Sequence, residues 1–219
     1  MIKLIIFDLD GTLIDSIHDL AAATNWVLKR HGYPTHPTDA YHYFVGDGVL
    51  MLIARALPEE ARTPEIIAQL KTEQVAYYHE HMLDHTKPFH GISEVLLELQ
   101  NRGYSLAVVT NKPNEQAQQL VKDFFPKINF IQVFGNRDGI PHKPDPTCVN
   151  MVIEQSGFTK DETLYIGDSD VDMLVANNAK VKGIGVLWGY RTKEELQKAG
   201  AYAIVDKVED LLRIAQNNH

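Results

Sequence analysis

Two aspartates near the start of the chain, Asp8 and Asp10, have a spacing that suits phosphate or metal chemistry. Residues two positions apart on a β-strand project to the same side, and Gly11 then lets the backbone turn close to whatever the two acids hold. Neighbouring carboxylates repel each other unless a cation or a shared proton lies between them. The pair therefore points to a phosphate site, although taken alone it also fits two acids in a solvated turn.

A second acidic run, GDSDVD, closes another apolar stretch of the chain. Asp168 follows that stretch directly and Asp172 lies one helical turn further on, so both can reach one crevice. Asp170 is better explained as charge at a helix N-terminus. Mg²⁺ takes oxygen ligands from one or two carboxylates and keeps water or phosphate in its other positions. We therefore predict a magnesium site formed by Asp8, Asp168 and a backbone carbonyl.

Cations and hydrogen-bond donors must accompany the acids, because phosphoryl transfer requires the charge on the moving group to be held in a fixed geometry. Lys143, in the stiff segment HKPDP, is the leading candidate, with a surface lysine as the alternative. Thr110 and Asn111 lie where a predicted strand ends and could donate to phosphate, or serve as ordinary turn and cap residues. The histidines of residues 79–90 are assigned to a solvated surface, because only His81 and His85 share a helical face.

The elements that must position these residues alternate between strands and helices. Short apolar runs predict buried strands at residues 2–9, 105–110, 129–135, 163–168, 183–189 and 201–205. Helical periodicity predicts helices at residues 93–102, 114–125, 146–156, 171–179 and 208–215. The alternation predicts an α/β fold with a parallel sheet. Its ligand crevice lies outside the carboxyl ends of the strands, which is where we expect Asp8, Asp10, Thr110, Asn111 and Asp168.

Residues 16–85 interrupt this alternation with a pattern that is helical only. We predict helices at residues 17–31, 49–57 and 64–83, with prolines at the joins. The predicted organisation is an α/β core of residues 1–15 and 86–219 with an inserted helical cap of residues 16–85.

Composition excludes several classes of protein. The 219 residues are 44% hydrophobic and carry a formal net charge of -8, which disfavours nucleic acid and anionic membranes as partners. Cys148 is the single cysteine, so no intramolecular disulfide forms, and we interpret it as a structural residue. The first ten residues match neither a signal peptide nor a membrane span. These features predict a cytoplasmic protein with neither nucleic acid nor a membrane as partner.

Four segments of the chain resemble, in order, the four motifs of the haloacid dehalogenase superfamily. They are FDLDGTL, the strand end at Thr110 and Asn111, Lys143 before Pro144, and GDSDVD. The resemblance implies a Rossmann-like core in which Asp8 attacks the phosphorus of a small phosphorylated metabolite and forms an aspartyl-phosphate. It implies that Asp172 supports the shell of an Mg²⁺ ion bound by Asp8 and Asp168, a site to which Asp10 is also assigned. It also implies that Asp10 protonates the leaving alcohol and then activates the water that hydrolyses the intermediate. The dehalogenases and phosphonatases lack an acid at the position of Asp10. A phosphatase that requires Mg²⁺ is therefore expected.

Three further segments, DSIHDLA, VGDGVLMLIARAL and VVTNKP, resemble the bacterial phosphoglycolate phosphatases. The resemblance implies that Gly46, Gly48 and Arg55 form a substrate-facing loop in the cap, whereas a plain turn and a solvent-facing arginine are the alternatives. The resemblance leads us to expect 2-phosphoglycolate as substrate. His18 departs from the family pattern, so pyrophosphate, a nucleoside monophosphate and a sugar phosphate stay as alternative substrates.

Two other classes of protein share parts of this pattern. A mutase similar to β-phosphoglucomutase would return the phosphate to a sugar by the same core chemistry. A signalling receiver domain would keep a phosphoryl group on Asp8, but the helical insertion and Asp10 both argue against it.

Overall fold

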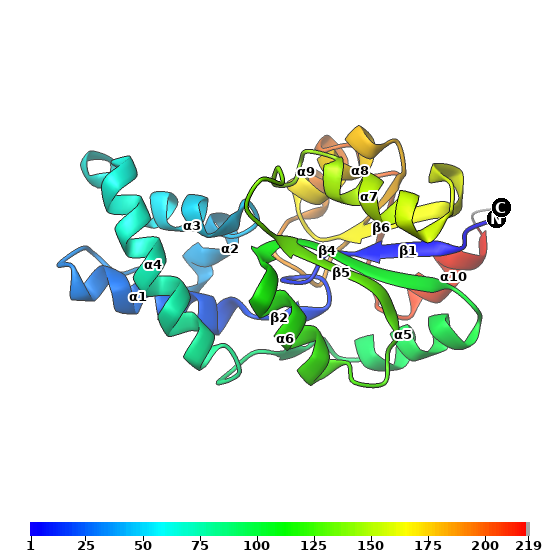
Figure 1. The fold of residues 1–219 in the computed structure, drawn as a ribbon, viewed down its shortest axis with the longest axis horizontal. Helices are drawn as coiled ribbons and strands as arrows, with labels where there is room; N and C mark the ends of the chain where they lie inside the picture. The colour runs from blue at the N-terminus through cyan, green and yellow to red at the C-terminus, as the bar shows by residue number, and fades with distance from the viewer. Residues whose placement is uncertain (218–219) are drawn as a thin grey trace. The chain divides into compact units, whose positions relative to one another are not determined.

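The computed structural model describes residues 1–217 and divides the chain into two compact units. One unit combines Met1–Ile14 with the chain from Pro88 onward, and the other is Asp15–Lys87. The first unit contains a six-stranded parallel sheet in the order β5-β4-β1-β6-β7-β8 (Figure 1). Its strands are β1 (Leu4–Phe7), β4 (Ser105–Pro113), β5 (Phe130–Asn136), β6 (Thr163–Gly167), β7 (Lys182–Val186) and β8 (Ala203–Val205).

Helices cover both faces of this sheet (Figure 1). The helices α7 and α8 pack on one face, and α5, α6 and α10 lie on the other. The bounds are α5 (Ile92–Asn101), α6 (Asn114–Phe124), α7 (Thr147–Ser156), α8 (Asp170–Ala179), α9 (Lys193–Lys198) and α10 (Asp210–Asn217). This architecture confirms the predicted Rossmann-like α/β fold.

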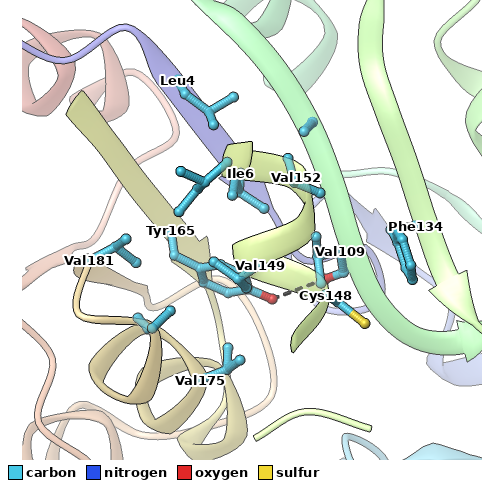
Figure 2. Close-up of a cluster of buried hydrophobic side chains, with 14 residues drawn as sticks. Leu4, Ile6, Val109, Phe134, Cys148, Val149, Val152, Tyr165, Val175 and Val181 are labelled. Carbon is cyan, nitrogen blue, oxygen red and sulfur yellow. Dashed lines mark hydrogen bonds between the residues drawn. The ribbon is translucent and has the colours of Figure 1, made fainter. Parts of the chain in front are cut away.

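A cluster of buried side chains fills the space between the sheet and helices α7 and α8 (Figure 2). Leu4 and Ile6 of β1 lie beside Tyr165 of β6 and pack against Val149 and Val175 from the two helices. Each aliphatic side chain buried in this way stabilises the fold by roughly 1.5–3 kcal/mol. The single cysteine, Cys148, belongs to the same cluster, and burial raises the pKa of its thiol. This buried position agrees with the interpretation of Cys148 as a structural residue.

The strand register brings the residues at the carboxyl ends of β1 and β6 level with the part of β4 that precedes Thr110. Phe7, the last residue of β1, is the partner of Val108 in β4 and of Ile166 in β6. The backbone N–H of Asp8 continues this ladder with a hydrogen bond of 2.9 Å to the carbonyl of Ile166. Parallel strands that end level with one another place the residues that follow them side by side.

The unit Asp15–Lys87 is built from helices around its own apolar cluster. Val27 and Leu28 of α1 meet Ile53 of α3 and Leu70 of α4 in this cluster. Its elements are α1 (Ile17–Arg30), η1 (Thr38–Ala40), α2 (Tyr41–Phe44), α3 (Gly48–Ala56), η2 (Glu59–Ala61) and α4 (Pro64–His81). Two short strands, β2 (Ile14–Asp15) and β3 (Lys87–Pro88), pair where the chain passes between the units. The role of residues 16–85 as a cap stays a prediction.

Some elements differ from the sequence prediction. Helix α9 and the one-turn helix α2 were not predicted, because six and four residues are too short to show helical periodicity. Strand β4 continues beyond Thr110 to Pro113, which pairs with Asn136 of β5 after a register shift. Among residues 1–217, none of the helices has the length and apolar content needed to cross a membrane.

A buried carboxylate fixes the beginning of α1 within the helical unit. Asp19 is 2% exposed, and its Oδ2 accepts hydrogen bonds from the backbone N–H groups of His85 and Thr86 at 3.0 and 2.8 Å. The hydroxyl of Thr86 donates a third bond at 2.7 Å. Asp19 therefore ties the first turn of α1 to the segment that precedes β3.

We expect Asp19→Ala to lower the free energy of unfolding by about 2–4 kcal/mol, because three buried donors lose their acceptor. Urea unfolding followed by Trp26 fluorescence, in a Trp188→Phe background, measures the helical unit. The exposed Asp39→Ala is the matched control, with an expected change below about 0.5 kcal/mol. Equal stability of the two variants would contradict the prediction.

Candidate active site

Asp8 lies directly after β1 and is buried, with 7% of its surface exposed. The Nζ atom of Lys143 lies 2.9 Å from Asp8 Oδ1, an ion pair whose angle is not that of a hydrogen bond. Oδ1 therefore accepts no hydrogen bond from the described residues. Burial and the charge of Asp172 raise the pKa of Asp8 to about 7, against the opposing effect of Lys143. Asp8 is thus a carboxylate with unused acceptor capacity and a cation beside it.

Lys143 is held in place through both its backbone and its side chain. The amide of Asn111 accepts a hydrogen bond from Lys143 N at 2.9 Å and donates one to Lys143 O at 3.1 Å. The ammonium donates to Asp172 Oδ1 at 2.7 Å. Burial alone would lower the pKa of Lys143, but the carboxylates of Asp172 and Asp8 outweigh it and hold that pKa well above its ordinary value. Lys143 therefore stays positively charged.

Asp172, in the first turn of α8, is fully buried, and both oxygens of its carboxylate accept hydrogen bonds. Its Oδ2 accepts hydrogen bonds from Ser169 N at 3.0 Å and from Ser169 Oγ at 2.7 Å. Its Oδ1 lies 2.7 Å from Lys143 Nζ and 3.1 Å from the hydroxyl of Tyr165. Since a carboxylate oxygen offers about two lone-pair sites, little capacity remains for another ligand.

Asp168 follows β6 and accepts one hydrogen bond on each oxygen. Thr12 Oγ1 donates to Oδ1 at 3.0 Å, and the backbone N–H of Tyr190 donates to Oδ2 at 2.8 Å. Burial and the charges of Asp172 and Asp8 raise the pKa of Asp168 well above its ordinary value. A Cβ at Gly11 or Gly189 would collide with this carboxylate, so glycine is required for the close approach.

Together these acids fit a divalent cation. Asp8, Asp168 and Asp172 each offer one oxygen, and these three oxygens lie within 4.8 Å of one another. With Lys143, the buried group would carry a net charge of about -2 when all three acids are ionised, and a divalent cation would balance it. Asp8 and Asp168 keep lone pairs for such an ion. The assignment of all four predicted aspartates to Mg²⁺ stays a prediction.

Asp10 is predicted as both a catalytic and a metal residue, and its carboxylate contacts a second lysine. Lys112 Nζ lies 3.0 and 3.1 Å from the two oxygens of Asp10. Only 2% of the Lys112 side chain is exposed. Sequence reasoning overlooked Lys112, although its position directly after Asn111 at a strand end was the available signal. The structure thus pairs each of Asp8 and Asp10 with its own ammonium.

The other predicted phosphate ligands of the core are also at the strand end. Thr110 is buried and its hydroxyl accepts a hydrogen bond from Lys112 N at 3.3 Å. Asn111 is buried as well, and its side-chain amide contacts the backbone of Lys143. Direct contacts of either residue with phosphate stay predictions.

The predicted substrate loop of the helical unit is held by Arg55. Its guanidinium pairs with the Asp47 carboxylate and donates a 3.1 Å hydrogen bond to the carbonyl of Phe44. Gly46 and Gly48 on either side of Asp47 have φ angles of 121° and 81°, a backbone region that favours glycine. The loop thus has a defined internal structure, and its contact with substrate stays a prediction.

Comparison with known proteins decides the family. The model of the haloacid dehalogenase-like hydrolases matches residues 5–186, which include the three buried aspartates and both lysines. The chain belongs to the haloacid dehalogenase-like hydrolase family. This confirms the family predicted from the four motifs, and with it the prediction of an enzyme of the phosphatase class.

Individual relatives resemble this hydrolase over almost its whole length. The phosphoglycolate phosphatase of Vibrio cholerae is 35% identical and covers 97% of this chain and 96% of its own. A crystal structure from Lactobacillus delbrueckii subsp. bulgaricus has a TM-score of 0.91 and 33% identity, covering 97% of this chain and 98% of its own. That of a predicted phosphoglycolate phosphatase from Haemophilus somnus has a TM-score of 0.89 and 30% identity, covering 98% of both chains.

The charge imbalance of the site predicts a pH-dependent effect on stability. The folded metal-free protein holds Asp8 with a raised pKa of about 7, so the ionised carboxylate destabilises it increasingly as the pH rises from about 4 to 7. Asp8→Asn removes that charge. In EDTA, we expect the stability of Asp8→Asn relative to wild type to be greater at pH 8 than at pH 4 by roughly 2–4 kcal/mol.

Denaturant titrations at both pH values provide the measurement, and the exposed Asp161→Asn serves as control. Adding Mg²⁺ at pH 8 should stabilise the wild type and reduce the difference, because the cation balances the buried charge. A difference between wild type and Asp8→Asn that does not change with pH would refute the predicted burial of charge.

Proposed function

We propose that this hydrolase is a Mg²⁺-dependent phosphatase that converts 2-phosphoglycolate to glycolate and phosphate through a phosphoryl group carried on Asp8. The observation that supports the chemistry best is the state of Asp8. It is a buried carboxylate whose Oδ1 accepts no hydrogen bond within residues 1–217 and lies 2.9 Å from a lysine. Such an oxygen can attack an electrophile without first breaking a hydrogen bond.

In the first half of the reaction, Asp8 attacks phosphorus and the bond from phosphorus to the glycolate oxygen breaks. The leaving oxygen takes a proton from Asp10, which lies two residues after Asp8 in the sequence. Lys112 contacts both oxygens of Asp10 and so fixes the plane of its carboxyl group. Lys143 beside Asp8 offsets negative charge on the transferred group.

In the second half, Asp10 accepts a proton from water as that water attacks phosphorus. The bond between Asp8 and phosphorus breaks, which releases phosphate and restores both carboxyl groups. One residue thus serves as acid and then as base. A fixed position for Asp10 matters because it must reach the leaving oxygen first and the water later.

Asp8 and Asp168 are the residues that would hold the metal ion, while Asp172 orients Lys143 and the start of α8. When bound, Mg²⁺ would supply positive charge that favours ionised Asp8 and neutralises the phosphate oxygens. The carboxylate set suits a hard cation with oxygen ligands.

The choice of 2-phosphoglycolate rests on the relatives. Proteins named phosphoglycolate phosphatase are 31–35% identical to this chain over 97% of its length. We further propose that the backbone N–H groups of the loop around Gly46 and Gly48 bind the substrate carboxylate, with Arg55 holding that loop through Asp47.

For the mechanism, we expect Asp8→Asn to lower kcat by more than roughly a thousandfold, because an amide cannot act as the nucleophile. Asp10→Asn should lower kcat by roughly 100- to 1,000-fold and allow the phosphorylated enzyme to accumulate. EDTA should silence the wild type, and Mg²⁺ should restore it. Steady-state phosphate release and intact-protein mass spectrometry measure both effects.

The control for these variants lies in the second acidic motif. Asp170 is about half exposed and pairs with Arg191 at 3.4 Å, so Asp170→Asn should keep kcat within about threefold of wild type. Undiminished hydrolysis by Asp8→Asn would refute the mechanism. A stable phosphate on wild-type enzyme without turnover would instead favour a receiver-like phospho-acceptor.

For the substrate, we expect kcat/KM for 2-phosphoglycolate to exceed that for nucleoside monophosphates, pyrophosphate and β-glucose 1-phosphate by at least about tenfold. A panel of these compounds, assayed for released phosphate and for glucose 6-phosphate, makes the comparison. A higher kcat/KM for pyrophosphate or a nucleotide would rule out this choice. Glucose 6-phosphate as product would indicate a mutase.

A further inference from the structure

The hydroxyl of Tyr165 is a polar group in an otherwise apolar cluster. Tyr165 lies on β6 with 0% of its surface exposed, among aliphatic side chains from β1, α7 and α8 (Figure 2). Burying a hydroxyl among such side chains is costly unless it is hydrogen-bonded. Phenylalanine would fill almost the same volume without that cost. The hydroxyl therefore has a role other than filling the core.

Three segments of the site meet at this one oxygen. Lys143 Nζ donates to it at 2.9 Å, from a position 22 residues away in sequence. The hydroxyl proton has two acceptors within reach, the carbonyl of Val109 at 3.0 Å and Asp172 Oδ1 at 3.1 Å. Figure 2 shows the bond to Val109, the residue that directly precedes Thr110. Tyr165 thus connects the end of β4, the loop of Lys143 and the first turn of α8.

The ammonium of Lys143 has three protons, and three oxygens surround it. Tyr165 Oη and Asp172 Oδ1 accept hydrogen bonds at 2.9 and 2.7 Å, and Asp8 Oδ1 lies 2.9 Å away. Two hydrogen bonds therefore fix the position of the ammonium at 2.9 Å from Asp8 Oδ1. Without the phenol oxygen, only the hydrogen bond to Asp172 would remain, and the ammonium could rotate about it.

We propose that Tyr165 is a positioning residue for phosphoryl transfer, whose hydroxyl holds the Lys143 ammonium against Asp8. The inference rests on the proposed function of Asp8 as nucleophile. Tyr165 would thus act on catalysis through Lys143 and not by contact with the substrate, because its buried hydroxyl already has Lys143, Val109 and Asp172 as hydrogen-bond partners.

Tyr165→Phe tests this role. We expect kcat for 2-phosphoglycolate to fall by roughly 10- to 100-fold while KM stays within about threefold, as for other groups that orient a catalytic residue. In a Lys143→Arg background the same change should cost less than about threefold, because the ammonium that Tyr165 positions is absent. A purely structural hydroxyl would give equal losses in both backgrounds.

Two controls keep the result interpretable. Tyr41→Phe removes another fully buried hydroxyl, one that donates to Asn25 at 2.7 Å, and should keep kcat within about twofold. All assays run well below the unfolding midpoint, with folding checked by near-ultraviolet circular dichroism. If Tyr165→Phe does not fold, Tyr165→Met fills the cavity with a flexible side chain and replaces it in the same comparison.

The outcomes separate this inference from the proposed function. An unchanged kcat in Tyr165→Phe would overturn the positioning role. If Lys143→Met were inactive in the same assay, the proposed phosphatase mechanism would still stand. Equal losses in the wild-type and Lys143→Arg backgrounds would also overturn it. Full activity of Asp8→Asn would reject the mechanism itself.

Discussion

Three carboxylates and one ammonium are buried together at the carboxyl end of the sheet, and the rest of the site depends on this imbalance of charge. Asp8, Asp168 and Asp172 lie close enough that one oxygen from each falls within 4.8 Å of the others, and Lys143 contacts two of them. At an effective dielectric constant near 20, like charges 4 Å apart repel by about 4 kcal/mol. A divalent cation would offset this repulsion, which supports the proposed role of the three acids in metal binding.

The fold supplies the rigidity that this arrangement requires. Strand β1 is completely buried between β4 and β6, and the apolar cluster beneath the site leaves its side chains little freedom. Asp10 acts on the buried trio less than the trio's own members do, since its charge raises the pKa of Asp8 less than burial or Asp172 does, and Lys112 forms an ion pair with it. The proposed nucleophile and the proposed acid-base group, two residues apart in sequence, therefore occupy different electrostatic environments. Under the proposed function, this difference would allow one carboxylate to react with phosphorus while the other exchanges protons.

The helical unit contributes a different kind of constraint. Its apolar cluster and the buried Asp19 stabilise it from within, and the guanidinium of Arg55 holds the loop around Asp47. Under the proposed function, Arg55 acts on the substrate through the shape of this loop. Binding a ligand through the Arg55 guanidinium would first require its ion pair with Asp47 to break, which costs more free energy than binding the ligand through backbone N–H groups. Specificity would then depend on loop geometry more than on an available positive charge.

The sequence alone determined the parts that follow from local pattern. Alternating apolar runs predict the parallel sheet, and acids directly after two such runs identify Asp8 and Asp168, because strand ends of a parallel sheet share one edge. Tertiary structure decided the partners. Lys112 meets Asp10 from 102 positions away, and Tyr165 reaches Lys143 across 22. No periodicity encodes these contacts, since they arise only when packing brings distant strand ends together, and a buried tyrosine looks in sequence like any other core residue.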